Sequence, residues 1–110
     1  MVRNVEAEAV SRMVQPPQHI TQAALAALDL QLAEAMLQKV ANLGFNMSQV
    51  QSIDSAGLNW LLSAQNRLAQ QGIHMVLHDP SPICLDVFVA TRLEQRFKLA
   101  TGTGQELRHA

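Results

Sequence analysis

Apolar and polar residues alternate along this chain with two different periods, one typical of strands and the other of helices. Residues 10–14 form a short apolar-rich stretch that predicts a strand. Pro16 and Pro17 end that strand, because proline has no amide hydrogen to donate to a sheet. In residues 5–9 apolar side chains alternate with glutamates, a pattern that fits either a strand or a helix.

A first helix is predicted after Thr21, which is a suitable N-cap residue. Apolar residues then recur at near-helical spacing and make one face of that helix: Leu25, Leu28, Leu32, Ala35 and Met36. Around Val40 the spacing changes to alternation, in which Leu43, Phe45 and Met47 are the apolar members. Alternation of this kind predicts a short strand that starts almost directly after the helix.

Residues 48–53 are mainly polar and predict a connection. A second helix is predicted behind Asp54, with leucines along one face: Leu58, Leu61, Leu62 and Leu68. Gly72 follows its last residues, where a left-handed residue commonly ends a helix. Residues 73–78 alternate once more and predict a strand.

A third helix is predicted with Ser81 as N-cap and Pro82 as its first residue, a favoured start. Its expected inner face consists of Ile83, Val87 and Ala90, with Leu85 or Phe88 beside them. Residues 96–99 predict a short last strand, and residues 100–110 a flexible tail. One domain is therefore expected over residues 1–99.

The predicted order of elements is strand, helix, strand, helix, strand, helix, short strand. Such alternation indicates an α/β fold, because parallel strands need crossover connections that helices supply. We expect a small sandwich with a mostly parallel sheet of four to five strands and helices packed against it.

Composition excludes several classes of protein. With 110 residues, 48% apolar and 15% charged, the chain is the size of one folded domain. A net charge of −1 argues against electrostatic capture of nucleic acid or of an anionic membrane. Neither a signal peptide nor an apolar run of roughly 18 residues is visible, so we expect a cytoplasmic protein without membrane insertion.

The segment from Asp54 to Leu58, which reads Asp-Ser-Ala-Gly-Leu, carries the most informative chemistry. It begins a helix, where unpaired backbone N–H groups and partial positive charge favour a capping oxygen or a phosphate. Gly57 has no side chain and would let a partner approach the backbone. Ser55 therefore has two compatible interpretations, an ordinary helix cap and a modifiable switch.

Residues 52–58, which read Ser-Ile-Asp-Ser-Ala-Gly-Leu, resemble the signature loop and helix start of the STAS family. The similarity continues through Gln71-Gly72, the following strand and the Pro-Ser-Pro entry to the third helix. It covers residues 43–99 well, and the N-terminal third by the order of its elements alone. This family contains bacterial anti-sigma-factor antagonists and STAS modules attached to transporters.

The resemblance implies a phosphorylation cycle at Ser55. The unphosphorylated module would bind an anti-sigma factor that is a GHKL-type serine kinase, and a phosphatase would reverse the modification. The partner would contact Asp54, Ser55, Ala56, Gly57, Leu58 and Trp60. We expect Trp60 on the surface, because its position turns it away from the leucine face of the helix.

One departure from the family favours an alternative. Family members usually carry a glycine and an acidic residue in an early turn, whereas residues 15–20 here read Gln-Pro-Pro-Gln-His-Ile. The alternative is a constitutive STAS subunit that docks on the ATPase of an ABC-type lipid transport complex.

Catalytic and metal sites are not indicated. The sequence offers no nucleophile–base–orienter set and no cofactor motif, so we expect neither an enzyme nor a bound cofactor. His74 and His78 share a strand face about 13 Å apart, which is too far for joint chelation. Cys84 is expected to be a small buried apolar residue.

Overall fold

A parallel four-stranded sheet is the centre of the fold in the computed structural model, which describes residues 11–101. The strands are β1 (Ser11–Val14), β3 (Asn42–Asn46), β5 (His74–His78) and β6 (Lys98–Ala100), and they lie in the order β1-β3-β5-β6. Every neighbouring pair in this sheet is parallel. The expected α/β class and mostly parallel sheet are therefore confirmed.

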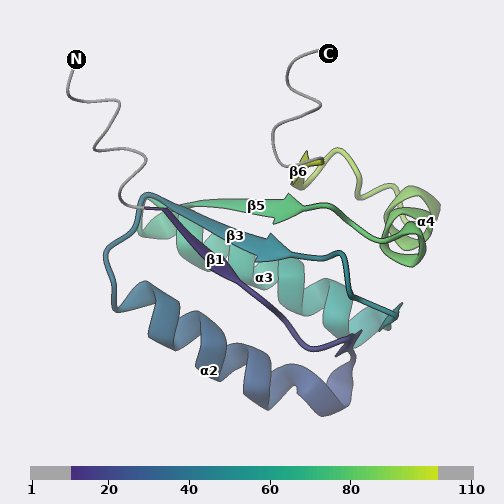
Figure 1. The fold of residues 1–110 in the computed structure, drawn as a ribbon, viewed down its shortest axis with the longest axis horizontal. Coiled ribbons are helices and arrows are strands. Elements are labelled where there is room, and N and C mark those ends of the chain that lie inside the picture. The colour runs from purple at the N-terminus through teal and green to yellow at the C-terminus, as the bar shows by residue number, and fades with distance from the viewer. Residues whose placement is uncertain (1–10, 102–110) are drawn as a thin grey trace.

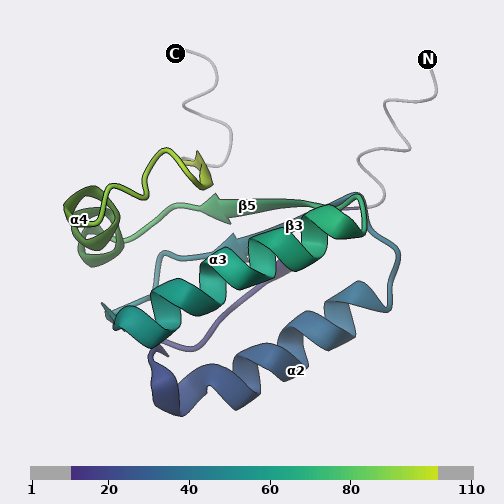
Figure 2. The ribbon, with the colours of Figure 1, turned by 180° about the vertical axis from the view of Figure 1, so that it is seen from behind.

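Helices α2 (Leu25–Met36) and α3 (Ser55–Gln70) cover the same face of the sheet, as the two opposite views in Figures 1 and 2 show. The short 3-10 helix η1 (Gln22–Ala24) leads into α2. Helix α4 (Pro82–Ala90) lies beyond the carboxyl ends of β3 and β5 (Figure 1). The sheet is thus packed by long helices on one side.

The core fills the layer between the sheet and these two helices. Strand residues that face the helices are buried, among them Val14, Leu43, Phe45, Met75 and Leu77. The predicted helix faces meet them, with Leu28, Leu32, Leu61 and Leu68 buried. Alternation in the strands and near-helical spacing in the helices had predicted both faces.

A second, two-stranded sheet joins β2 (His19–Ile20) to β4 (Ser52–Ile53) in parallel. The sequence had predicted only a polar connection over residues 48–53. This small sheet matters for the site, because only Asp54 separates β4 from α3.

Local signals at two helix ends are confirmed. Ser81 caps α4, and its hydroxyl accepts a hydrogen bond from the backbone N–H of Cys84. The same hydroxyl donates to the carbonyl of Val50 at 2.8 Å. Gly72, with φ of 77°, follows α3 in the left-handed region, as predicted for a helix end.

Other expectations need correction. Thr21 occupies the N-cap position of η1, but its side chain makes no capping hydrogen bond. On α4 the buried residues are Cys84 and Phe88, whereas Ile83 and Ala90, expected inside, are exposed. The last strand begins and ends later than residues 96–99, so residue 100 belongs to the sheet. Residues 1–10 and 102–110, including the expected tail, lie outside the described residues.

Candidate functional site

The segment from Asp54 to Leu58 lies at the carboxyl end of the sheet, where β4 passes into α3. In Figure 1 this end of the molecule also holds α4. In parallel α/β sheets, loops at the carboxyl ends of strands commonly build binding sites. The fold therefore places the start of α3, where Asp54 and Ser55 are exposed, at this end of the sheet.

Asp54 is the N-cap of α3. Its carboxylate Oδ1 accepts a hydrogen bond from the Gly57 backbone N–H at 2.8 Å. The other oxygen, Oδ2, accepts from the Gln22 backbone N–H at 3.1 Å. These two bonds lower the pKa of Asp54 below its ordinary value of 3.8, because they stabilise the ionised form. The bond from Gly57 has the larger effect, and the bond from Gln22 the smaller. Asp54 thus joins the start of α3 to the segment that leads into α2.

Ser55 is the first residue of α3, and it is exposed. Its hydroxyl makes no hydrogen bond to any of residues 11–101, because the capping role belongs to Asp54. This corrects the expectation that Ser55 could itself be the cap. A free hydroxyl at a helix N-terminus is accessible to a modifying enzyme, and the helix end favours an anion there.

Gly57 is buried, and its missing side chain serves the chain's own packing. A Cβ atom at this position would lie 1.9 Å from the backbone oxygen of Ile20 and 2.8 Å from its carbonyl carbon. The close approach expected of a partner is made instead by β2. The same Ile20 oxygen accepts a hydrogen bond from the Asp54 N–H at 3.3 Å.

Trp60 is buried, which contradicts the expectation that it lies on the surface. Its indole N–H donates to Asp29 Oδ1 on α2 at 2.7 Å, and its ring meets Phe45 edge-on at 6.2 Å between centroids. Trp60 is buried because it contacts α2 and β3. The spacing of apolar residues within α3 alone cannot predict these contacts. Trp60 links the two helices.

The exposed part of the site is therefore small. Asp54 and Ser55 are exposed and Ala56 is partly so, whereas Gly57 and Leu58 are buried. Asn59, which the sequence analysis did not single out, is exposed one helical turn after Ser55. Nearby, His19 Nδ1 lies 2.8 Å from the Ser52 hydroxyl, a pair that only the unexpected β2–β4 sheet brings together.

Among residues 11–101, no three His, Cys, Asp or Glu side chains gather closely enough to hold a metal ion. Cys84 is fully buried, and its burial raises the pKa of the thiol, so the thiolate is disfavoured. No helix in the described residues is long and apolar enough to span a membrane.

Two comparisons with known proteins give matches. The STAS domain family matches residues 4–105, which is nearly the whole chain. A search of solved structures finds the anti-sigma-factor antagonist SpoIIAA in its unphosphorylated form. That structure superposes with a TM-score of 0.70 at 19% sequence identity, over 89% of this chain and 85% of the other.

No curated protein matches the chain in sequence. At 19% identity the structural likeness concerns the fold alone, and the family match covers the site segment as well as the sheet and helices. The chain belongs to the STAS domain family.

Proposed function

We propose that this STAS domain is a non-enzymatic regulatory binding module of the anti-sigma-factor-antagonist type, switched by phosphorylation of Ser55. The observation that carries the proposal is the state of Ser55, an exposed hydroxyl without a hydrogen-bond partner among residues 11–101 at the first position of a helix. Membership of the STAS domain family, together with the fold shared with an anti-sigma-factor antagonist, supports the same class of function.

A phosphate on Ser55 would add charge to a binding surface of this domain in which the neighbouring Asp54 carboxylate already has a fixed position. The carboxylate of Asp54 is held by two backbone N–H groups, so it stays in place whether or not Ser55 is modified. A phosphate adds roughly 1.5 to 2 negative charges at neutral pH. Beside the Asp54 carboxylate, that charge would repel an acidic partner surface and resist desolvation at any packed interface.

The proposed partners follow from this switch. A serine kinase of the GHKL type that is also an anti-sigma factor would bind the unphosphorylated module through Asp54, Ser55 and Ala56. The same kinase would modify Ser55 and so end the complex. A phosphatase would remove the phosphate and return the module to its binding state, in a bacterial cytoplasm.

A second candidate is a constitutive subunit docked on the ATPase of an ABC-type lipid transporter. The observation that favours it is the segment over residues 15–20, which lacks the acidic residue expected near a phosphorylation surface. In this case Ser55 would lie in a permanent contact and would not need modification.

An affinity pull-down from host lysate distinguishes the two candidates, with wild-type protein, Ser55→Asp and Ser63→Asp as baits. Ser63 is exposed and lies on the same helix, so Ser63→Asp adds the same charge away from the site. Under the proposal, wild type and Ser63→Asp capture a GHKL-type kinase and Ser55→Asp loses it. The captured kinase with ATP then modifies wild type and leaves Ser55→Ala unmodified.

Capture of an ABC ATPase by all three baits would instead establish the second candidate. Equal capture of a kinase by wild type and Ser55→Asp would disprove the switch, because charge at Ser55 would then have no effect on binding.

A further inference from the structure

Helix α2 has apolar residues on two sides, and the core uses only one of them. The inner side packs towards α3 and β1 through Leu28, Leu32 and Ala35, which are fully buried. A second apolar stripe runs along the outer side, and all of its members are exposed: Ala26, Leu30, Ala33 and Leu37. No helix or strand of residues 11–101 covers this side, which lies at the margin of the molecule in both views (Figures 1 and 2).

The spacing of the outer stripe is that of a helix packed along another helix. Steps of four, three and four residues follow the 3.5-residue repeat of coiled-coil seams. Within the stripe alanine and leucine alternate, and Leu30 and Leu37 are 62% and 82% exposed. Layers interdigitate well when a large residue faces a small one. The stripe therefore fits a partner helix in which large and small residues alternate in the opposite order.

The same helix of a second copy has that order when it runs antiparallel. A two-fold axis between residues 31 and 32 would place Leu30 opposite Ala33 of the second copy, and Leu37 opposite its Ala26. Every layer of the seam would then pair one leucine with one alanine. A parallel pair would instead set alanine against alanine, which leaves gaps that close packing disfavours.

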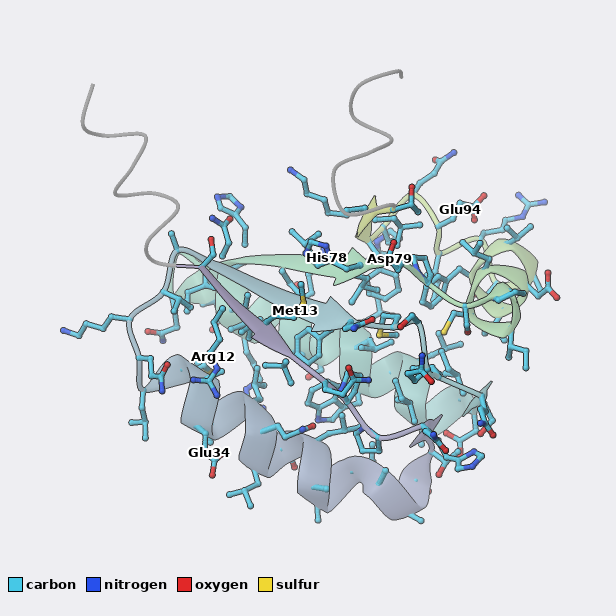
Figure 3. All side chains as sticks on the ribbon, in the orientation of Figure 1. Arg12, Met13, Glu34, His78, Asp79 and Glu94 are labelled. Carbon is cyan, nitrogen blue, oxygen red and sulfur yellow. The ribbon has the colours of Figure 1, made fainter. Side chains whose placement is uncertain are left out.

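Charge favours the antiparallel direction as well. Asp29 and Glu34 are the charged residues of α2, and Figure 3 shows Glu34 on the side of the helix away from the sheet. In a parallel pair, Asp29 would lie beside Glu34 of the second copy, and like charges repel. In the antiparallel pair, the exposed Lys39 after α2 would lie near the start of the other α2, where the Asp54 carboxylate accepts from Gln22. Opposite charges would thus approach at both ends of the seam.

We propose that the outer stripe of α2 is an interface through which two copies of this chain form an antiparallel helix pair. The contact runs from residue 26 to residue 37, about 17 Å of helix. Because this is less than a standard interface of about 800 Å² on each side, we expect a weak, reversible dimer with a dissociation constant on the order of 100 µM. Ser55 begins α3 and is not in the seam, so the dimer goes beyond the proposed switch and does not depend on it.

Sedimentation equilibrium of the full chain, from about 10 µM to about 1 mM, measures that constant. Leu30→Glu should raise it at least about tenfold, because each copy would bring a charge into the apolar seam. Val89→Glu is the control, because Val89 is 59% exposed on α4, outside the seam, and the same charge there should leave the constant unchanged. Thermal unfolding establishes that each variant is folded, as expected for exposed positions.

An exchange of large and small residues tests the packing itself. Ala33→Leu adds exposed apolar surface, which would strengthen a non-specific association. In the proposed pair it would set leucine against leucine, so we expect the dissociation constant to rise about tenfold. The double variant Leu30→Ala with Ala33→Leu restores one large and one small residue in each of these layers. Its constant should therefore return to within about threefold of wild type.

Charge at the ends of the seam is tested with a matched pair of lysines. Lys39→Glu should weaken the dimer about threefold, whereas Lys98→Glu, at an exposed lysine of β6, should not. A chain that is monomeric at about 1 mM would overturn the proposal. So would a tighter dimer of Ala33→Leu, which would reveal non-specific apolar association. A dimer lost in Val89→Glu and kept in Leu30→Glu would also overturn it, because the interface would then lie on α4.

Discussion

Adjacent residues at the start of α3 differ in how firmly the surrounding chain holds them. Asp54 accepts two backbone hydrogen bonds, one from its own helix and one from Gln22 across the chain. Ser55 makes none within residues 11–101 and is exposed to solvent. A substitution at Asp54 is therefore expected to act on stability, and one at Ser55 on binding.

The contribution of Asp54 should depend on pH. Its pKa is lowered in the folded state, so its stabilising effect is complete above its ordinary value of 3.8 and disappears as the pH falls through the lowered pKa. We expect Asp54→Asn to lower the thermal midpoint at neutral pH, because an amide cannot accept from both N–H groups. The difference between wild type and variant should shrink below about pH 4.

Asp86→Asn is the control for that measurement, because it removes an exposed carboxylate from α4 without touching the cap. Thermal unfolding between acid and neutral pH, followed by circular dichroism, gives both differences. An Asp54→Asn difference that is the same at every pH would contradict the role assigned to the ionised carboxylate.

Single residues in the sequence correctly predicted the features that depend only on neighbouring positions in the chain. The Ser81 cap, the left-handed Gly72 and the buried Cys84 each depend on a few neighbouring positions, and all three are found as predicted. Trp60 could not be predicted in this way. Its burial depends on Asp29 and Phe45, which lie 31 and 15 positions earlier in the chain and reach it only through the packing of α2 and β3.

At the scale of elements, periodicity succeeded where a segment is long and has two distinct faces. Helices α2 and α3 and strands β3 and β5 meet that condition. Helix α4 does not, because nearly all of its residues are apolar, so spacing could not tell the face of Cys84 and Phe88 from the exposed one. Strands β2 and β4 have two residues each, which is too short for a period.

The contact between β2 and α3 nevertheless shapes the site, and Gly57→Ala tests it. The added methyl group would meet the backbone of Ile20, which cannot rotate away as a side chain would. We expect a loss of about 2 kcal/mol in the free energy of unfolding, typical of an overpacked position. Urea denaturation measures it, with Ser63→Ala on the exposed side of the same helix as control.

An unchanged stability of Gly57→Ala would mean that β2 can move away from α3 at little cost. In that case the close packing of Ile20 over the first turn would not be what requires glycine at position 57.

At the scale of the whole molecule, the exposed part of the Ser55 segment is separate from the hydrophobic core. The Ser55 segment lies where the strands end, at the same end of the molecule as α4 (Figure 1). The core between the sheet and α2 and α3 does not include the Ser55 side chain, which is exposed. A change of the Ser55 side chain should therefore leave the fold intact.

Ser55→Asp makes this separation measurable. An acidic residue in the first turn of a helix is mildly stabilising, and repulsion from the neighbouring Asp54 carboxylate opposes that gain. We expect the free energy of unfolding to stay within about 0.5 kcal/mol of wild type, as for most exposed substitutions. In a domain of this size that is a shift of about 4 °C or less in the thermal midpoint, measured by calorimetry. If the midpoint is unchanged within this range, loss of partner binding by Ser55→Asp is an effect of surface charge. A midpoint lowered by 10 °C or more corresponds to a loss of roughly 1 to 2 kcal/mol in the free energy of unfolding. That result would show that charge at Ser55 acts by unfolding the helix start.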